Sequence, residues 1–178
     1  MGGNMNGVGN THLVGEFNFY GDPEGAKMVL DEYTPLVPTT IVTWEATCIN
    51  LFPSTHFDTA GKSVLGDFFH AIRQHSLSNF DKEKQDEVKF QWMWHRFGDS
   101  GACMCDLLAP IVLLYPELVT TKEDFPVSVE LNGQYTRSMM VVDRMRQFHT
   151  ILPNRSPACL VVEVDIAKAS KLAEMKFY

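Results

Sequence analysis

The chain has 178 residues, of which 45% are hydrophobic and 21% are charged, as in ordinary soluble globular proteins. A net charge of −7 disfavours nucleic acid and anionic membranes as partners, because both bind basic surfaces. No apolar run reaches the length of a transmembrane helix, and the four cysteines fit neither a disulfide framework nor a zinc site. These features predict one domain with free thiols in a reducing compartment, the cytoplasm.

The first part of the chain is predicted to pass from a loop into a helix and then into a strand. Residues 1–10 contain four glycines and three asparagines, which is a loop composition. Asp22 can cap a helix that starts at Pro23. The predicted inner face of that helix consists of Ala26, Val29, Leu30 and Tyr33. The β-branched residues of 39–44 predict a strand.

The middle of the chain is predicted to be helical. One amphipathic helix is expected over residues 65–72, and a second helix over residues 81–97. Residues 102–115 predict a mostly buried helix that is bent or ended near Pro110, because proline disrupts the helical hydrogen bonds.

The last part of the chain adds strands and a closing helix. Alternating valines in 127–131 predict a half-buried strand, and Asn132-Gly133 predicts a two-residue hairpin turn before a returning strand over 137–142. Residues 159–164 predict another buried strand. Asp165 is expected to cap a last helix, whose inner face consists of Ile166, Ala169, Leu172, Ala173 and Phe177. The interleaved elements predict an α/β fold with a β-hairpin near the C-terminus.

The first candidate for chemistry is the pair Glu16 and Asn18. In an extended segment, residues two apart point to the same side. A carboxylate beside a carboxamide suits the two hydroxyls of a vicinal diol, because it can accept hydrogen bonds while the amide donates and accepts. The surrounding glycines form neither a Rossmann fingerprint nor a P-loop. Composition alone favours the simpler interpretation, in which the asparagines make turn hydrogen bonds and Glu16 is solvated.

The second candidate is Asp106, which precedes the apolar residues 107–111. A buried carboxylate is costly unless it is paired or binds a metal, and Ca²⁺ would suit it but needs about six to eight oxygen ligands. Asp106 could instead cap the helix.

Trp92, Trp94 and His95 could stack on a base or sugar, although aromatic residues more often pack in the core. No G-x-S-x-G or H-E-x-x-H motif is present.

Taken together, these segments resemble the inosine–uridine-preferring nucleoside hydrolase family. The family shows M-G-G, G-N, E-F-N and D-P-E-A-A in this order; the matching segments here are Met1-Gly2-Gly3, Gly9-Asn10, Glu16-Phe17-Asn18 and Asp22-Pro23-Glu24 with Ala26. Two later segments, Cys105-Asp106 with Ala109 and then Tyr115-Pro116-Glu117-Leu118, are similar to the family's H-D-P-x-A and x-P-E-L. The resemblance covers essentially the whole chain and implies the family's open, Rossmann-like α/β sheet.

The resemblance implies hydrolysis of the N-glycosidic bond of ribonucleosides to ribose and a free base. In this family a Ca²⁺ ion binds the ribose hydroxyls and the attacking water, and the transition state is oxocarbenium-like. Carried over residue by residue, Asn10, Glu16 and Asn18 would hold the ribose hydroxyls, and Met1 would lie in the same pocket. Asp106 would be a Ca²⁺ ligand. The expected partner is a small-molecule ribonucleoside, and self-association into a homo-oligomer is also expected.

Two departures from the family pattern affect these expectations. Cys105 stands where well-known members carry a histidine that protonates the leaving group and where a purine-specific branch carries tryptophan. A thiol can donate only weakly near pH 7, so a packing role is the alternative for Cys105. The family's opening D-x-D-x-x-x-D-D motif, which supplies most Ca²⁺ ligands and the base, does not occur in the chain. Residues 1–178 are therefore predicted to form the C-terminal half of the family domain, without its Asp-rich part.

Three functional hypotheses follow. The first is a Ca²⁺-dependent nucleoside N-ribohydrolase. The second is a catalytically inactive fragment that binds ribose weakly or pairs with a full-length subunit. The third is a general sugar-binding module that uses Trp92 and Trp94 as stacking surfaces. The sequence does not distinguish purine from pyrimidine nucleosides, because base contacts in this family come from variable loops.

Overall fold

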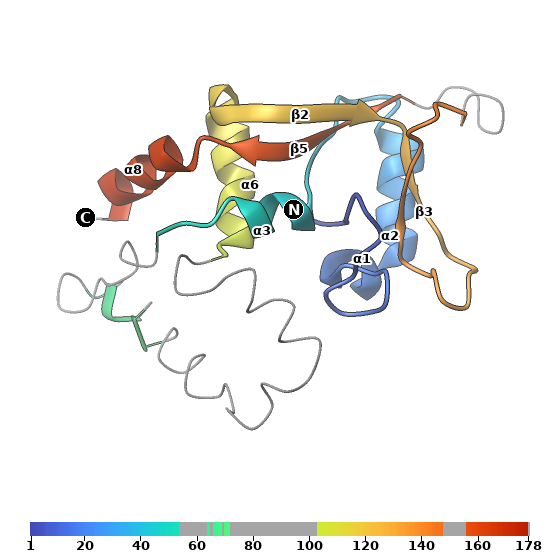
Figure 1. Ribbon diagram of the computed structural model, residues 1–178, viewed down its shortest axis with the longest axis horizontal. Coiled ribbons are helices and arrows are strands. Elements are labelled where there is room, and N and C mark those ends of the chain that lie inside the picture. The colour runs from blue at the N-terminus through green and yellow to red at the C-terminus, as the bar shows by residue number, and fades with distance from the viewer. Residues whose placement is uncertain (54–63, 65, 69, 72–102, 148–155, 178) are drawn as a thin grey trace. The chain divides into compact units, whose positions relative to one another are not determined.

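The computed structural model describes residues 1–53, 64, 66–68, 70–71, 103–147 and 156–177 (Figure 1). The chain divides into two compact units, the first made of Met1–Ile49 with Cys105–Val164 and the second of Asn50–Met104 with Asp165–Tyr178. All the residues predicted to bind ribose or metal belong to the first unit. The predicted helix over 81–97, with Trp92, Trp94 and His95, lies outside the described residues. Most of the predicted 65–72 stripe does too, and its described member Phe68 is 57% exposed.

The first unit contains a three-stranded mixed sheet. The central strand β5 (Ala158–Val164) pairs in parallel with β1 (Thr40–Val42) and antiparallel with β2 (Val119–Phe125), as Figure 1 shows for β2 and β5. Helices and strands are both present, and the sheet contains a parallel pair, which confirms the predicted α/β class. The strand β2 was not predicted, because its sequence is mostly polar. It is an edge strand whose middle five residues are exposed, so it needs no apolar side chains there.

The helix predicted to start at Pro23 is confirmed. It forms α2 (Pro23–Met28), and the Asp22 carboxylate accepts a hydrogen bond of 2.8 Å from the Gly25 N–H. The predicted inner face is only partly correct, because Leu30 is buried but Val29 and Tyr33 are about half exposed. The reason is that the chain continues as the π-helical turn η1 (Val29–Tyr33), whose wider winding moves later side chains off a 3.6-residue stripe.

The helix predicted over 102–115 is α6 (Cys105–Leu114). It continues through Pro110, so of the two predicted outcomes, a bend or an end near the proline, the end is wrong. Leu108, Ile111 and Val112 are buried on both sides of the proline, and this packing offsets the hydrogen bond that proline cannot make. The two short helices α1 (Phe17–Gly21) and α3 (Trp44–Ile49) and the 3-10 turn η4 (Pro116–Leu118) complete the helices described in this unit.

The predicted hairpin is present, but its turn differs. Strands β3 (Val127–Val129) and β4 (Met140–Val142) pair antiparallel, so residues 130–139 form the connection instead of Asn132-Gly133 alone. The Glu130 carboxylate accepts hydrogen bonds from the N–H groups of Asn132 and Gly133, at 2.7 and 3.0 Å. This side chain therefore organises a wider loop in place of the two-residue turn.

An ion pair joins this hairpin loop to α2. Arg137 Nη2 lies 2.7 and 3.0 Å from the two Glu24 carboxylate oxygens, and Nη1 donates to the Leu131 carbonyl at 2.7 Å. The hydrogen bond from Arg137 lowers the pKa of Glu24 below its ordinary value. Because the pKa of Glu24 is lower in the folded state than in the unfolded state, the ion pair stabilises the fold at every pH above the unfolded-state pKa. This stabilisation is lost as the pH falls through the folded-state pKa.

The variant Arg137→Met should therefore be less stable than the wild type at pH 7, and the difference should shrink as the pH falls below about 4. Both side chains are largely exposed, so the difference should also shrink in 1 M salt. Urea unfolding of both proteins at pH 7 and at a pH below about 4 measures this effect. A difference that is constant across the pH range would contradict the assigned role of the Glu24 carboxylate.

The core of the first unit lies between the sheet, the hairpin and the N-terminal segment. It consists of Met5, Phe19, Leu30, Ile41, Val127, Val129, Met140, Ala158 and Leu160. The N-terminal loop therefore packs into the fold through Met5, and α1 packs through Phe19. This packing fixes the position of the predicted ribose-binding residues.

In the second unit, the predicted cap of the last helix is confirmed. The Asp165 carboxylate accepts a hydrogen bond of 3.1 Å from the Lys168 N–H at the start of α8 (Ile166–Phe177). Ala169 is buried, and Ile166 and Leu172 are partly buried, while the side chains of the two other predicted inner residues lie outside the described set. None of the helices in the described ranges has the length and apolar character needed to cross a membrane.

Candidate functional site

The N-terminal segment Met1–Gly3 lies at the carboxyl end of β1. Gly2 N–H donates to the Val42 carbonyl at 3.1 Å, and the Gly3 carbonyl accepts from Trp44 N–H at 2.9 Å. In open α/β sheets, ligands bind outside the carboxyl ends of the strands. The predicted ribose-binding segment is therefore at an end of the sheet where such sites form.

Glu16 is buried, with 1% of its surface exposed. Its Oε2 atom accepts hydrogen bonds from the backbone N–H groups of Gly3 at 2.9 Å, Asn18 at 3.1 Å and Phe19 at 3.3 Å. The interpretation of Glu16 as a solvated side chain is therefore wrong. Glu16 is the N-cap of α1 and also joins this helix to the glycine-rich loop.

Asn18 lies beside Glu16, although not for the predicted reason. It belongs to α1 and not to an extended segment, and its Nδ2 atom reaches Glu16 Oε1 at 3.3 Å. The same Nδ2 atom lies 3.3 Å from the Met1 carbonyl oxygen and 3.5 Å from Met1 Sδ. The structure thus brings together Met1, Glu16 and Asn18, which are named here the carboxylate–amide cluster.

Asn10 lies in the same loop and is bound to its backbone. Its Oδ1 atom accepts from the Phe17 N–H at 2.9 Å and from the Thr11 hydroxyl at 3.2 Å. These are the turn hydrogen bonds expected of an asparagine in a glycine-rich loop. They also fix Asn10 to Phe17, the first residue of α1, which directly follows Glu16 of the carboxylate–amide cluster.

Two residues that support this loop were not predicted from the sequence. Asn4 is 1% exposed, and its Nδ2 atom donates to the carbonyls of Val8 and Val14 at 3.1 and 2.8 Å. The Glu45 carboxylate of α3 accepts from the N–H groups of Met5 and Asn6, at 2.9 Å each. The asparagine-rich composition was the one available signal for Asn4, and no local pattern indicates the long-range role of Glu45.

The conformation of Gly3 makes a specific prediction about this loop. Its φ of +69° is a conformation that favours glycine, and a Cβ atom there would lie 2.8 Å from Met140 Sδ and 2.9 Å from Phe19 Cζ. Gly3→Ala should therefore lower the free energy of unfolding by about 1–3 kcal/mol. Gly21→Ala is the matched control, because a Cβ atom there meets nothing within 4 Å. Equal urea midpoints for the two variants would contradict this description of the loop.

Asp106 lies in the first turn of α6, and its side chain is exposed. The expectation of a buried carboxylate was wrong, because the helix turns Leu108, Ile111 and Val112 inward and Asp106 outward. The neighbouring Cys105 is partly buried. Within the described ranges, no three His, Cys, Asp or Glu side chains gather at one point. Since Ca²⁺ takes about six to eight oxygen ligands, the described residues do not by themselves form a calcium site.

The chain is similar to known nucleoside hydrolases. The profile of the inosine-uridine preferring nucleoside hydrolase family matches residues 1–171. A protein of Escherichia fergusonii named pyrimidine-specific ribonucleoside hydrolase RihA is 33% identical over 180 residues, covering 100% of this chain and 52% of that protein. The RihA of Shigella flexneri serotype 5b is 33% identical over 165 residues, covering 93% of this chain and 47% of its own length. The chain thus spans about half the length of these curated relatives.

Solved structures show the same fold. An inosine-guanosine nucleoside hydrolase superposes with a TM-score of 0.73 at 22% identity and covers 100% of this chain and 51% of its own. A plant nucleoside hydrolase superposes with a TM-score of 0.70 at 18% identity, covering 97% of this chain and 50% of its own. The profile match over nearly the whole chain shows that it belongs to the inosine-uridine preferring nucleoside hydrolase family.

Proposed function

We propose that the chain provides the ribose-binding part of a nucleoside hydrolase, which cleaves the N-glycosidic bond of ribonucleosides to give ribose and a free base. The observation that carries this proposal is the carboxylate–amide cluster at the carboxyl end of β1. Family membership supports a hydrolase acting on nucleosides.

The cluster can hold a diol. Oε2 of Glu16 accepts three backbone N–H bonds, whereas Oε1 accepts one long bond of 3.3 Å from the Asn18 amide. A carboxylate has about four lone-pair positions, so Oε1 can accept a ribose hydroxyl in place of the amide. The displaced Asn18 amide, on an exposed side chain, can then bond the adjacent hydroxyl. Asn10 supports this arrangement by holding the start of α1.

The carboxylate also suits the chemistry of the reaction. Cleavage of a glycosidic bond proceeds through an oxocarbenium-like transition state, in which positive charge develops on the sugar. A buried, oriented negative charge next to the ribose stabilises that charge more than it stabilises the neutral substrate. Glu16 would therefore contribute to catalysis as well as to binding. Cys105, at the family's histidine position, would at most donate a weak hydrogen bond to the leaving base.

We further propose Ca²⁺ as the metal of the active enzyme, with Asp106 as one ligand. The described residues provide too few oxygens for such a site, so the remaining ligands would come from other segments. The proposed substrates are ribonucleosides as a class, because the relatives' names differ: pyrimidine-specific in E. fergusonii and inosine-guanosine for one of the solved structures. A cytoplasmic location and self-association into a homo-oligomer also remain proposals.

Hydrolysis of matched ribo- and deoxyribonucleosides tests this function. The protein is incubated with Ca²⁺ and uridine, cytidine, inosine or guanosine, and released sugar and base are quantified. We expect equal amounts of ribose and base, loss of turnover with a chelator, and at least tenfold lower kcat/KM for 2′-deoxyuridine than for uridine, because one cluster hydrogen bond is lost. A folded protein that binds ribose but releases none from any ribonucleoside would support the inactive fragment. A folded protein that neither binds nor releases ribose would overturn the proposed function.

A further inference from the structure

Three polar side chains form a closed ring of hydrogen bonds between the helices and the hairpin. Lys27 Nζ lies 2.6 Å from Asp31 Oδ2 and donates to Ser128 Oγ at 3.1 Å. The Ser128 hydroxyl donates to Asp31 Oδ1 at 2.9 Å. These three side chains are named here the Lys–Asp–Ser ring. Ser128 is only 6% exposed and its hydroxyl faces an ion pair, so the ring suits holding elements together and not reacting with a substrate.

The ring fixes the hairpin to α2 where the helix changes its winding. Lys27 lies in the last turn of α2, and Asp31 lies in the π-helical turn η1. Such turns are rare and occur frequently at functional sites. Strand β3 packs against both α2 and η1. The ion pair of Arg137 with Glu24 is a second link from the hairpin to α2. The hairpin is therefore tied to this helix through its strand as well as through its loop.

The same hairpin lies against the two backbone segments that hold Glu16. Met140 Sδ of β4 lies against Gly3, whose N–H donates to Glu16 Oε2 at 2.9 Å. Ser138 Oγ lies against Gly15, the residue before Glu16. A shift of the hairpin would therefore move the Gly3 N–H relative to the carboxylate that accepts it.

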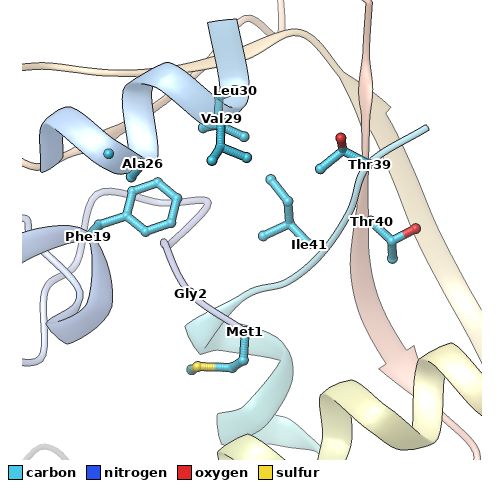
Figure 2. Close-up of a pocket in the computed structure, with 10 residues that line it drawn as sticks. Met1, Gly2, Phe19, Ala26, Val29, Leu30, Thr39, Thr40 and Ile41 are labelled. Carbon is cyan, nitrogen blue, oxygen red and sulfur yellow. The ribbon is translucent and has the colours of Figure 1, made fainter. Parts of the chain in front are cut away.

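The helices hold the Glu16 carboxylate from their own side. The N–H groups of Asn18 and Phe19 in α1 donate to the same Glu16 Oε2 atom. Asp22 ends α1 and caps α2, so these two helices are directly joined. Figure 2 shows the Phe19 ring close to Ala26 of α2, at one side of an apolar pocket that both residues line. Glu16 Oε2 thus joins one donor that the hairpin positions to two donors that the helices position.

We propose that the Lys–Asp–Ser ring positions the Glu16 carboxylate for ribose recognition, a role that rests on the proposed function. By fixing the hairpin to α2, the ring keeps the Gly3 N–H aligned with Glu16 Oε2. This bond leaves Oε1 directed at Asn18, where a ribose hydroxyl is proposed to bind. The members of the ring are positioning residues and do not need to touch the substrate. A misplacement of about 1 Å can cost on the order of 100-fold in rate.

Hydrogen exchange of the Gly3 amide tests the positioning directly. Lys27→Met opens the ring, and the partly exposed position of Lys27 should allow the variant to fold. Exchange at Gly3 is compared with exchange at Leu160, a fully buried residue of the central strand β5. The Gly3-to-Leu160 ratio of exchange rates should rise at least fivefold, because the loop opens locally while the sheet stays intact.

Lys168→Met is the matched control for this variant. Lys168 also pairs with an aspartate of its own segment, Asp165 at 2.7 Å, but it belongs to the second unit. Its ratio of exchange rates should stay within about twofold of the wild type, since an exposed ion pair contributes little. An unchanged ratio in Lys27→Met, whether both amides accelerate equally or neither does, would overturn the proposal.

Sugar discrimination tests the consequence for the reaction. Ser128→Ala opens the ring from the hairpin side, and Ser170→Ala removes another buried serine hydroxyl as the control. The kcat/KM for the fastest-cleaved of uridine, cytidine, inosine and guanosine is divided by that for its 2′-deoxy counterpart. This quotient should fall at least threefold in Ser128→Ala and Lys27→Met, because a misaligned carboxylate distinguishes the hydroxyls less well. It should not change in Ser170→Ala.

The two measurements separate the ring's role from the activity itself. An unchanged quotient in both ring variants would overturn the proposal, because a merely structural defect lowers turnover of both nucleosides alike. The exchange measurement does not depend on turnover. A chain that cleaves no ribonucleoside would contradict the proposed function, and the Gly3 amide would still decide whether the ring positions Glu16.

Discussion

Replacing Glu16 by alanine is expected to lower the free energy of unfolding by about 2–4 kcal/mol. Three buried or partly buried N–H groups, those of Gly3, Asn18 and Phe19, would lose their acceptor, and each unsatisfied donor costs about 1–3 kcal/mol before relaxation. Loss of the α1 N-cap accounts for about 1 kcal/mol of the total. Urea unfolding followed by circular dichroism measures the change.

Glu117→Ala provides the control for this experiment, because Glu117 is an exposed glutamate in the short turn η4. Its change should stay within about 0.5 kcal/mol. Glu16→Gln should be intermediate, since the remaining amide oxygen can still accept N–H bonds. If Glu16→Ala and Glu117→Ala were equally stable, the carboxylate would not hold the loop to α1.

Replacing Asn18 by alanine is expected to reduce kcat/KM for ribonucleoside hydrolysis by about 10- to 100-fold. The exposed amide is proposed to bond a ribose hydroxyl, and losing a hydrogen bond to a charged or reacting group costs about 1.5–3 kcal/mol. Ribose release under subsaturating substrate measures this ratio. The free energy of unfolding should change little, because the side chain is exposed.

Asn6→Ala is the matched control, because Asn6 is an exposed asparagine of the same segment that lies outside the carboxylate–amide cluster. Its side chain accepts from Arg144 at 3.1 Å. Its kcat/KM should stay within about twofold of the wild type, since a surface side chain away from the site affects turnover little. Equal losses in Asn6→Ala and Asn18→Ala would show that the segment matters for folding and not for ribose recognition.

Local chemistry made several elements predictable. Asp22 and Pro23 identified the start of α2, because capping depends on neighbouring residues only. The alternating valines identified β3, and the returning strand expected over 137–142 contains β4. The hairpin loop was not predictable from Asn132-Gly133 alone. The Glu130 carboxylate accepts hydrogen bonds from the N–H groups of both residues, and the wider loop that results does not follow from the turn dipeptide.

The candidate site was predictable in its residues but not in its geometry. Motif order identified Glu16 and Asn18, yet the burial of Glu16 depends on Gly3, thirteen residues away in sequence. The exposure of Asp106 could have been read from helical spacing. Leu108, Ile111 and Val112 share one face, and Asp106, two residues before Leu108, falls on the other. The role of Glu45 depends on a contact across forty residues, which no local pattern reveals.

Titration of the ¹⁵N-labelled chain with ribose and 2-deoxyribose, in the presence of Ca²⁺, tests most directly whether the carboxylate–amide cluster binds the sugar. We expect ribose to shift the amide signals of Gly3, Asn18 and Phe19, the three N–H groups held by Glu16. The shifts should be smaller with 2-deoxyribose and absent in Asn18→Ala. Ribose-induced shifts that avoid these amides, or that are unchanged in Asn18→Ala, would contradict the proposed site.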